Sequence, residues 1–339
     1  MANGNHREIS VIMCAYTQER WLDLQQAIES INDQTIQPNE VILVIDHNPE
    51  LLKAAQATFR GVNVIENSGV KGLSAARNSG LARSTGEIVA FIDEDAIADA
   101  NWLETLLHSY DDPGVMGVGG EVRPMWGATP PAWFPEEYNW VVGCSYKGLP
   151  TTTSPVRNPI GCNMSFRRNA IDCAGGFRIG IGRIGKIPLG CEETELAIRI
   201  RQLAPDSIYL FNPKAAVYHK VPQWRTRWTY FVSRCYAEGR SKALVTLFVG
   251  ANDGLSSERR YVVHTLSQAV IDDLKRPGLR EKAVGVTRAF AILTGLFLTT
   301  LGYVVGVLSN RKIEKTQGLD SLSASLGHDC GSSPTMIGR

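Results

Sequence analysis

The chain has 339 residues, a formal net charge of +1, 44% hydrophobic residues and 20% charged residues. Its length and composition are those of a folded protein with a sizeable core, which excludes a disordered or fibrous chain. The near-neutral charge excludes a global attraction to nucleic acid, so no nucleic-acid partner is expected, and an anionic ligand must be bound by a local site.

Residues 8–100 alternate short apolar segments with helical patterns. The segments EISVIMCAY, EVILVID, VNVIE and EIVAFID are predicted strands, and WLDLQQAIESIND and SAARNSGLARS are predicted helices. Runs of Val and Ile between helices indicate parallel strands that are covered on both faces. The sequence therefore predicts an α/β fold with a ligand site beyond the carboxyl ends of these strands.

Acidic residues end two of the predicted strands. Asp46 ends the second strand, and Asp93-Glu94-Asp95 ends the fourth. Carboxylates separated by one residue suit a hard divalent cation, Mg²⁺ or Mn²⁺, that also holds a diphosphate. Asp46 can accept hydrogen bonds from a base or ribose. The alternatives are a solvated turn at the triplet and a turn-capping role for Asp46.

Three further positions carry candidate chemistry. Arg77 is expected either to face the phosphates or to lie in a solvent-exposed pair with its neighbour. Glu192 and Glu193 open a predicted helix, where carboxylates either stabilise the helix dipole or supply a base with a raised pKa. His219 ends another predicted strand and either completes a metal's coordination or is structural.

The chain becomes less regular after residue 100 and helical after residue 220. The segment GATPPAWFPEEYNW is too apolar and aromatic for a linker and is predicted to form an ordered wall of a site. Residues 221–284 are predicted to be helical and partly amphipathic. Their tryptophans alternate with Arg225, Arg227 and Arg234, which fits either a membrane-interfacial collar or ordinary packing on the preceding domain.

Residues 285–310 are predicted to form a transmembrane helix. The stretch from Ala289 to Leu308 has twenty residues without a charge, about the length that crosses a hydrocarbon core of roughly 30 Å. Arg288 precedes this stretch and Arg311 follows it, as flanking anchors do. A buried core helix and a helix lying in the membrane plane are the alternatives.

Charge and cysteine patterns predict the location of the chain. Basic residues before the apolar stretch, such as Lys275 and Arg280, favour a cell-membrane protein whose large N-terminal part is cytoplasmic. The seven cysteines include no C-x-x-C pair and follow no signal-peptide pattern, so reduced core cysteines are expected. Residues 311–339, rich in Ser and Gly, are predicted to be disordered.

Three of these segments, in this order, resemble glycosyltransferase family 2, whose members have the GT-A nucleotide-sugar-binding fold. ISVIMCAYTQERWLDLQQAIESINDQTIQPNEVILVID resembles the first βαβ unit, GLSAARNSGLARSTGEIVAFIDEDA the D-x-D region, and GCEETEL the start of the catalytic helix. The resemblance covers about residues 8–245. It implies a catalytic domain at 8–220, with a nucleotide-binding half at 8–100 and an acceptor-binding half at 101–220.

The resemblance also implies roles on the donor side of the site. Thr17, Glu19 and Asp46 would hold the nucleoside of a nucleotide-sugar, expected to be a UDP-sugar. Asp93 and Asp95 would be the D-x-D carboxylates that bind Mn²⁺ or Mg²⁺. Asp95 is the expected direct ligand.

On the acceptor side, the resemblance implies a base and an additional metal ligand. Glu193 would be the general base, with Glu192 as the alternative, where most relatives have aspartate. His219 matches a histidine that some members place at the metal. The Q-x-x-R-W pattern of processive polymerases is not met, because Gln223 lies one residue too far from Arg227-Trp228. Transfer of a single sugar is therefore expected.

The segments PEEYNWVVG, VRNPIGCNMSFRR and GCEETEL are similar to glucuronosyltransferases that extend glucosyl-dolichyl phosphate. This resemblance implies an inverting transfer, with UDP-glucuronic acid as a candidate donor, to a hydroxyl of a polyprenyl- or dolichyl-phosphate-linked glycan at the membrane. Two alternatives stay open: a polyprenyl-phosphate monosaccharide synthase, and a non-catalytic membrane scaffold with the same fold. A nucleotidyltransferase is disfavoured, because CAYTQERW lacks the Gly-rich phosphate loop.

Overall fold

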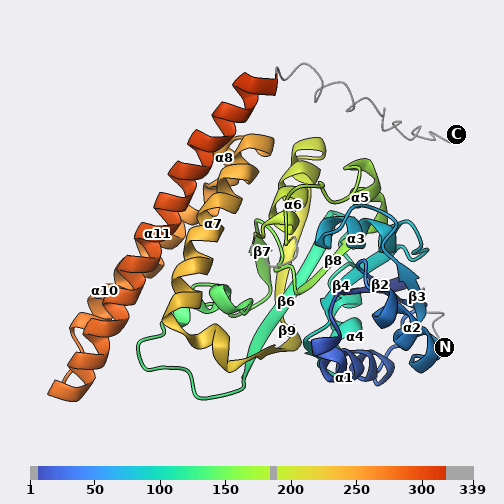
Figure 1. The fold of residues 1–339 in the computed structure, drawn as a ribbon, viewed down its shortest axis with the longest axis horizontal. Coiled ribbons are helices and arrows are strands. Elements are labelled where there is room, and N and C mark those ends of the chain that lie inside the picture. Colours follow the sequence, from blue (N-terminus) through green and yellow to red (C-terminus); the bar gives the residue numbers. More distant parts are fainter. Residues whose placement is uncertain (1–6, 184–188, 318–339) are drawn as a thin grey trace, which may run out of the picture.

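One mixed sheet runs through the protein, and the computed structural model describes residues 7–183 and 189–317 of it. The strand order is β3-β2-β1-β4-β8-β6-β9-β5, and β7 pairs with β9 (Figure 1). The strands are β1 (Ile9–Ala15), β2 (Glu40–Ile45), β3 (Asn63–Glu66), β4 (Ile88–Asp93), β5 (Ala96–Ala98), β6 (Val115–Trp126), β7 (Ser154–Val156), β8 (Asn163–Arg167) and β9 (Ile208–Val221).

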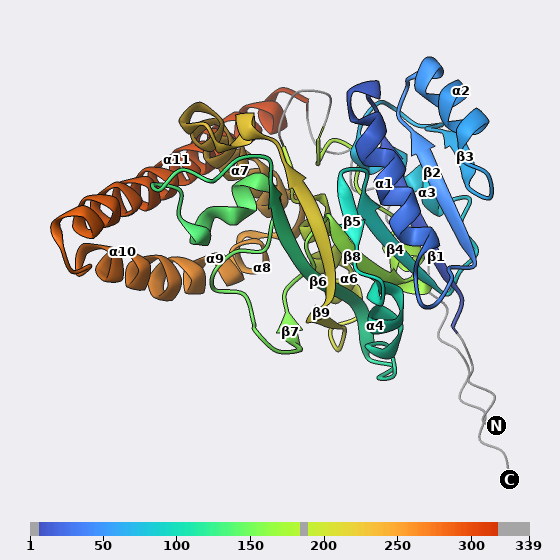
Figure 2. The same cartoon turned by 90° about the horizontal axis from the view of Figure 1, so that it is seen from below.

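The four strands β3, β2, β1 and β4 are parallel, as the Val- and Ile-rich segments predict. Alternate residues of each strand enter two separate cores, so that Val11 and Met13 of β1 point to one side and Ile12 to the other. The first core receives α1 (Trp21–Asn32), α2 (Pro49–Thr58) and α4 (Trp102–His108). The second receives α3 (Leu73–Leu81), α5 (Arg168–Cys173) and α6 (Glu192–Leu203) (Figure 2). Both faces of the sheet are therefore covered.

The antiparallel part of the sheet brings distant segments to the end of β4. Strand β8 pairs antiparallel with β4, and β6 pairs with both β8 and β9. The short strand β5 follows the acidic triplet and pairs antiparallel with β9, which sets Ala96 opposite His219. This pairing places the end of β9 beside the triplet, a contact that strand prediction alone does not give.

The C-terminal helices form one side of the molecule (Figure 1). They are α7 (Trp228–Val249), α8 (Ala251–Gly254), α9 (Ser256–Arg260), a π-helical turn at Tyr261–Leu266, α10 (Ser267–Leu274) and α11 (Leu279–Gln317). The predicted helical region is thus confirmed. Helix α11 is long and apolar enough to cross a membrane between Leu279 and Asn310, and it packs lengthwise on α7.

Helix α11 itself continues to Gln317, because the segment RKIEKTQ consists mostly of good helix formers. The predicted disorder of residues 311–339 stays a prediction, and residues 318–339 lie outside the described part of the chain. One expectation needs correction. Five cysteines have free thiols, at Cys14, Cys144, Cys162, Cys191 and Cys235, but Cys173 is disulfide-bonded, so the expectation of reduced cysteines is wrong at that position.

Candidate active site

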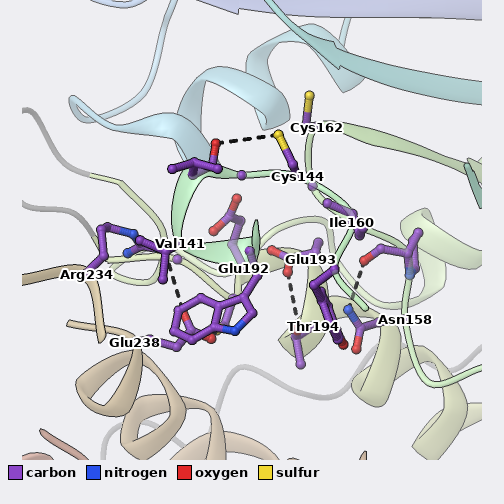
Figure 3. Close-up of a pocket in the computed structure, with 18 of the residues that line it drawn as sticks. Val141, Cys144, Asn158, Ile160, Cys162, Glu192, Glu193, Thr194, Arg234 and Glu238 are labelled. Atoms are coloured by element: carbon purple, nitrogen blue, oxygen red, sulfur yellow. Dashed lines mark hydrogen bonds and ion pairs between the residues drawn. The ribbon is translucent and has the colours of Figure 1, made fainter. Parts of the chain in front are cut away.

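A cavity of about 1330 Å³ opens at the carboxyl ends of β1, β2 and β4. Asp46 and Asp93 line one end, and Glu192 and Glu193 at the start of α6 line the middle. The segment around Tyr138 also lines it, as predicted for an ordered wall of a site. Figure 3 shows the part of the cavity around Glu192 and Glu193, with Cys162 of the neighbouring loop and Glu238 of α7 nearby. The acidic positions found in the sequence therefore meet in one cavity.

Asp46 has a specific local role at the end of β2. Its Oδ1 accepts a hydrogen bond from Asn67 Nδ2 at 2.7 Å, and its Oδ2 accepts one from the backbone N–H of Gly72 at 3.0 Å. The expected alternative, a cap for the next turn, falls instead to Asn48, whose side chain accepts from the N–H of Leu51. Asp46 thus joins two loops at the edge of the cavity and keeps lone pairs for a ligand.

Thr17 and Glu19 lie outside the cavity lining. Thr17 caps the short helical turn Gln18–Arg20 by accepting a hydrogen bond from the N–H of Glu19 at 3.3 Å, and Glu19 is exposed. The neighbouring Tyr16 and Arg20 line the cavity instead. A nucleoside contact of Thr17 and Glu19 stays a prediction.

Three ligand atoms of different kinds lie close together at the end of β4. Single donor atoms of Asp93, Cys162 and His219 all lie within 4.8 Å of one another. The carboxylate oxygen suits hard cations such as Mn²⁺ and Mg²⁺, whereas imidazole nitrogen and sulfur are ligands that softer ions such as Zn²⁺ prefer. These residues fit a metal ion, and Cys162 is a donor that sequence reasoning missed.

Asp95 is buried among cationic groups. Its Oδ2 lies 3.0 Å from Arg20 Nη1 and 3.5 Å from Arg225 Nη2, and its Oδ1 lies 3.3 Å from His219 Nε2. Burial alone would raise the pKa of Asp95, but these partners hold it well below its usual range. Burial likewise opposes protonation of His219, yet the adjacent Asp95 raises its pKa to about 10. Direct metal ligation by Asp95 stays a prediction, because its oxygens are already paired.

Arg77 connects the two acidic groups of the cavity. The side chain is 3% exposed, which excludes the expected alternative of a solvent-exposed pair. Its Nη1 lies 2.7 Å from Glu192 Oε1, and its Nη2 lies 3.5 Å from Asp93 Oδ1 and donates to the carbonyl of Gly161 at 3.0 Å. Arg77 therefore holds the start of α6 beside the end of β4.

Glu192 and Glu193 are adjacent in the chain but differ in environment. Glu192 is 4% exposed and paired with Arg77, and its Oε2 makes no hydrogen bond with the described residues. Glu193 is half-buried, and its Oε1 accepts a hydrogen bond from the hydroxyl of Thr194 at 3.1 Å (Figure 3). Burial and the nearby Glu192 carboxylate raise the pKa of Glu193 to about 8. A carboxylate with this pKa can accept a proton near neutral pH.

A second group of charged residues lines the far end of the cavity. Arg157 contacts Glu258 with both guanidinium nitrogens, at 2.6 and 2.9 Å, and Lys242 of α7 lies 2.6 Å from Glu258 and 3.2 Å from Glu238. Burial opposes the charge of Glu258, but Lys242 and Arg157 lower its pKa to about 2. Beyond this group, the cavity is lined by Leu296, Thr299, Thr300 and Tyr303 of α11.

Sequence reasoning missed most of these cations. Arg225 was expected either in an interfacial collar or in ordinary packing; it is 4% exposed and contacts Asp95, which excludes the collar for this residue. Arg227 and Trp224 of the same segment are exposed. Only the position of Arg225 directly after the His219 strand could have suggested its role.

Comparisons with known proteins identify the family of the chain. The model of "Glycosyl transferase family 2" matches residues 10–175. A glucosyl-dolichyl phosphate glucuronosyltransferase of Haloferax volcanii is 33% identical over 314 residues, which cover 91% of this chain and 99% of the relative. The succinoglycan biosynthesis protein ExoM of Rhizobium meliloti is 29% identical over 171 residues, about half of each chain.

Solved structures share the fold. A mannosyltransferase of Pyrobaculum calidifontis in complex with GDP-Man and Mn²⁺ superposes with a TM-score of 0.57 at 18% identity, over 92% of this chain and 89% of that one. GalNAc-T7 in complex with UDP, GalNAc and Mn²⁺ superposes with a TM-score of 0.50 at 16% identity, over 76% of this chain and 54% of that one. The fold is therefore that of the GT-A glycosyltransferases, as predicted. The chain belongs to glycosyltransferase family 2 and is a glycosyltransferase.

Proposed function

We propose that the protein is an inverting, metal-dependent transferase that moves one sugar from a UDP-sugar to a hydroxyl of a polyprenyl- or dolichyl-phosphate-linked glycan. One observation carries the proposal: a single cavity joins Asp93, Glu193 and the apolar helix α11. Such a cavity offers a place for a metal-bound donor at one end and for a lipid-linked acceptor at the other. The name of the Haloferax relative supports UDP-glucuronic acid as the donor to test first.

The donor end of the cavity would bind the nucleotide. Asp93, His219 and Cys162 would hold Mn²⁺ or Mg²⁺, with Asp95 orienting His219 through their 3.3 Å contact. When bound, the ion would offset negative charge on the diphosphate. Arg77 would contribute positive charge at the same place, because its guanidinium lies 3.5 Å from Asp93. Thr17, Glu19 and Asp46 are proposed to hold the nucleoside.

The acceptor hydroxyl would lose its proton to Glu193. The hydroxyl oxygen forms a bond to the anomeric carbon while the bond from that carbon to the diphosphate oxygen breaks, and the electron pair of the broken bond leaves with UDP. Attack opposite the departing group inverts the configuration. Glu193 suits the role of base because its pKa is raised to about 8, whereas Glu192 is neutralised by Arg77.

The decisive experiment is a donor screen on purified protein in detergent with Mn²⁺. Nucleotide release is read with glucosyl-polyprenyl phosphate, with bare polyprenyl phosphate and with no acceptor. Release of UDP from UDP-glucuronic acid that requires the glycolipid supports the proposal. Release with bare polyprenyl phosphate identifies a monosaccharide synthase, whose anionic acceptor needs no base. If no nucleotide is released with any donor, although the protein still binds UDP and metal, a non-catalytic scaffold is favoured.

The proposal places the protein at the cell membrane with its catalytic domain in the cytoplasm. Helix α11 supports membrane association by its length and apolarity. The basic residues before it support the cytoplasmic side. Labelling of the intact cell with a membrane-impermeant reagent, which should spare the catalytic domain, tests the sidedness.

A further inference from the structure

The charge-free stretch of α11 has two different faces. Six large apolar side chains, each between 40% and 64% exposed, recur at spacings of three or four residues: Phe290, Leu293, Phe297, Leu301, Val304 and Leu308. This spacing places them on one face of the helix. We call these six residues the outer stripe. It is a continuous apolar surface, and Val286, which is 49% exposed four residues before Phe290, extends it towards the N-terminus of α11.

The opposite face of α11 is packed on the catalytic domain. A Cβ added at Gly239 of α7 would lie 2.0 Å from the carbonyl oxygen of Thr299, and one added at Gly302 would lie 2.1 Å from that of Tyr236. Further towards the N-terminus, the hydroxyl of Tyr138 donates to the carbonyl of Ile292 at 3.0 Å. Backbones that approach this closely leave no room for lipid between α11 and α7. Figure 1 shows the two helices side by side.

This packing conflicts with a helix that crosses the bilayer. Along the apolar stretch of α11, helix α7 carries Arg240, which is exposed and whose Cα lies 3.4 Å from a Cβ added at Gly306. If α11 crossed the membrane, α7 would accompany it and bring Arg240 into the bilayer, where a charged side chain is unfavourable. The charged cluster around Lys242 lies on the same helix and would follow it. Helix α11 can be apolar on all sides without crossing the bilayer, because one face packs on the catalytic domain and the other would contact lipid.

We propose that α11 is an in-plane membrane anchor whose outer stripe lies in the acyl boundary of one leaflet. The proposal rests on the proposed function only in taking the membrane as the home of the acceptor. Trp228, at the start of α7, is 36% exposed and stacks on Phe290 with 5.9 Å between ring centroids. An amphipathic aromatic residue beside the stripe is typical of the headgroup region.

The position of the cavity favours a bilayer over a protein partner. Leu296 and Thr300, on the flank of α11 beside the stripe, line the cavity that contains Glu193. With the stripe in the leaflet, this end of the cavity lies at the membrane surface. A lipid-linked acceptor can then place its headgroup beside Lys242 and Arg157 while its chain stays in the leaflet. A second protein copy on the stripe would cover this route.

Site-directed spin labelling of the full chain tests the proposal. Nitroxides are attached to Phe290→Cys, Phe297→Cys, Leu301→Cys and Leu308→Cys, and the protein is bound to vesicles of phosphatidylcholine and phosphatidylglycerol. Relaxation by dissolved O₂ is compared with relaxation by a polar nickel chelate, which reports depth. Wild-type protein treated in the same way corrects for the native cysteines, and Lys282→Cys, which is exposed before the stripe, is the aqueous reference.

An in-plane helix gives the same shallow depth at all four positions. A depth that peaks near Phe297 and Leu301 and falls to water towards Phe290 and Leu308 shows a spanning helix and overturns the proposal. Protection from both reagents, with dipolar broadening between labels, shows a second copy on the stripe and also overturns it. Transfer to the glycolipid in detergent is measured on the same protein, so that failure of the proposed function is seen separately.

A charge on the stripe provides a second, independent measurement. The double variant Phe297→Glu, Leu301→Glu is expected to lose at least about tenfold in partitioning to these vesicles, because it removes two large apolar side chains from the leaflet. Its binding of UDP should be unchanged. The matched control is Leu203→Glu on α6, which alters a leucine that is 61% exposed outside the stripe and should partition like the wild type. Unchanged partitioning of the double variant contradicts the proposal.

Discussion

Arg77 and Glu192 form a buried ion pair in which Arg77 Nη1 lies 2.7 Å from Glu192 Oε1, and both side chains are at most 6% exposed. The pair joins α3 to the start of α6 across the cavity. The pair also distinguishes two glutamates that the sequence alone does not separate. Glu192 forms an ion pair with Arg77, whereas Glu193 faces the cavity without such a partner among the described residues. The predictions about catalysis follow from this difference.

The substitution Glu193→Gln should remove turnover and retain donor binding. The amide has nearly the same shape but cannot accept a proton, so kcat should fall by about a hundredfold to ten-thousandfold. Calorimetric titration with UDP should give a Kd close to that of the wild type. Persistent turnover would remove Glu193 from the role of base.

Glu192→Gln is the matched control for that experiment, and its defect should be of another kind. It leaves Arg77 without its closest carboxylate in a buried setting, so the protein should lose roughly 3–5 kcal/mol of stability. Thermal unfolding detects this loss, whereas Glu193→Gln should unfold like the wild type. A stable Glu192→Gln protein without turnover would assign the base to Glu192.

The rate should increase with pH up to a plateau above pH 8. Because burial and Glu192 raise the pKa of Glu193 to about 8, most Glu193 side chains are protonated at pH 7 and only the ionised form accepts a proton. In kcat/KM measured from pH 6 to 9, the rising limb should shift in Glu193→Asp. A profile that is flat across this range contradicts the assignment.

Metal binding should depend on Asp93 and His219 and should show a contribution from sulfur. Asp93→Asn is expected to weaken Mn²⁺ binding about tenfold or more, measured by the electron paramagnetic resonance signal of the free ion. With Cd²⁺, the wild type should show a sulfur-to-metal absorption band that Cys162→Ser lacks. A band that survives in Cys162→Ser excludes Cys162 as a ligand.

Asp95→Ala should abolish transfer in a protein that still folds. Asp95 contacts His219 at 3.3 Å and Arg20 at 3.0 Å, so its loss should disturb the geometry at the metal and the donor. Transfer from the UDP-sugar is the measurement, and circular dichroism confirms the fold. Full activity in folded Asp95→Ala protein removes this residue from the site.

The cluster around Glu258 should stabilise the protein above acidic pH. The folded-state pKa of Glu258 is lowered from 4.5 to about 2, so its stabilising effect is present above pH 4.5 and is lost as the pH falls towards 2. The shift corresponds to about 3 kcal/mol. Glu258→Gln should therefore lose about that amount in denaturant unfolding at pH 7, and the difference from the wild type should shrink near pH 3. A pH-independent difference would contradict an electrostatic cause.

Much of the site could be predicted from the residues alone because its elements are local. Runs of Val and Ile end at Asp46 and at Asp93, and parallel strands present their carboxyl ends at one edge. A predicted helix starts at Glu192 and Glu193 in the same way. Such signals depend on neighbouring residues. The strands, the helices and the convergence of the acidic groups could therefore all be predicted from the sequence.

The remaining features depend on long-range contacts. The sequence around Cys162 does not indicate that it comes to lie beside Asp93, and the position of Arg225 after the His219 strand is only a weak signal for its contact with Asp95. The pairings of β8 with β4 and of β5 with β9 bring these residues there. The same holds for α11. Its composition determined that it would be an apolar helix, but the close contacts of Gly239 and Gly302 decided which face meets the protein and which is left exposed. A sequence specifies the polarity of each side chain, whereas a partner for that side chain exists only once distant segments have packed.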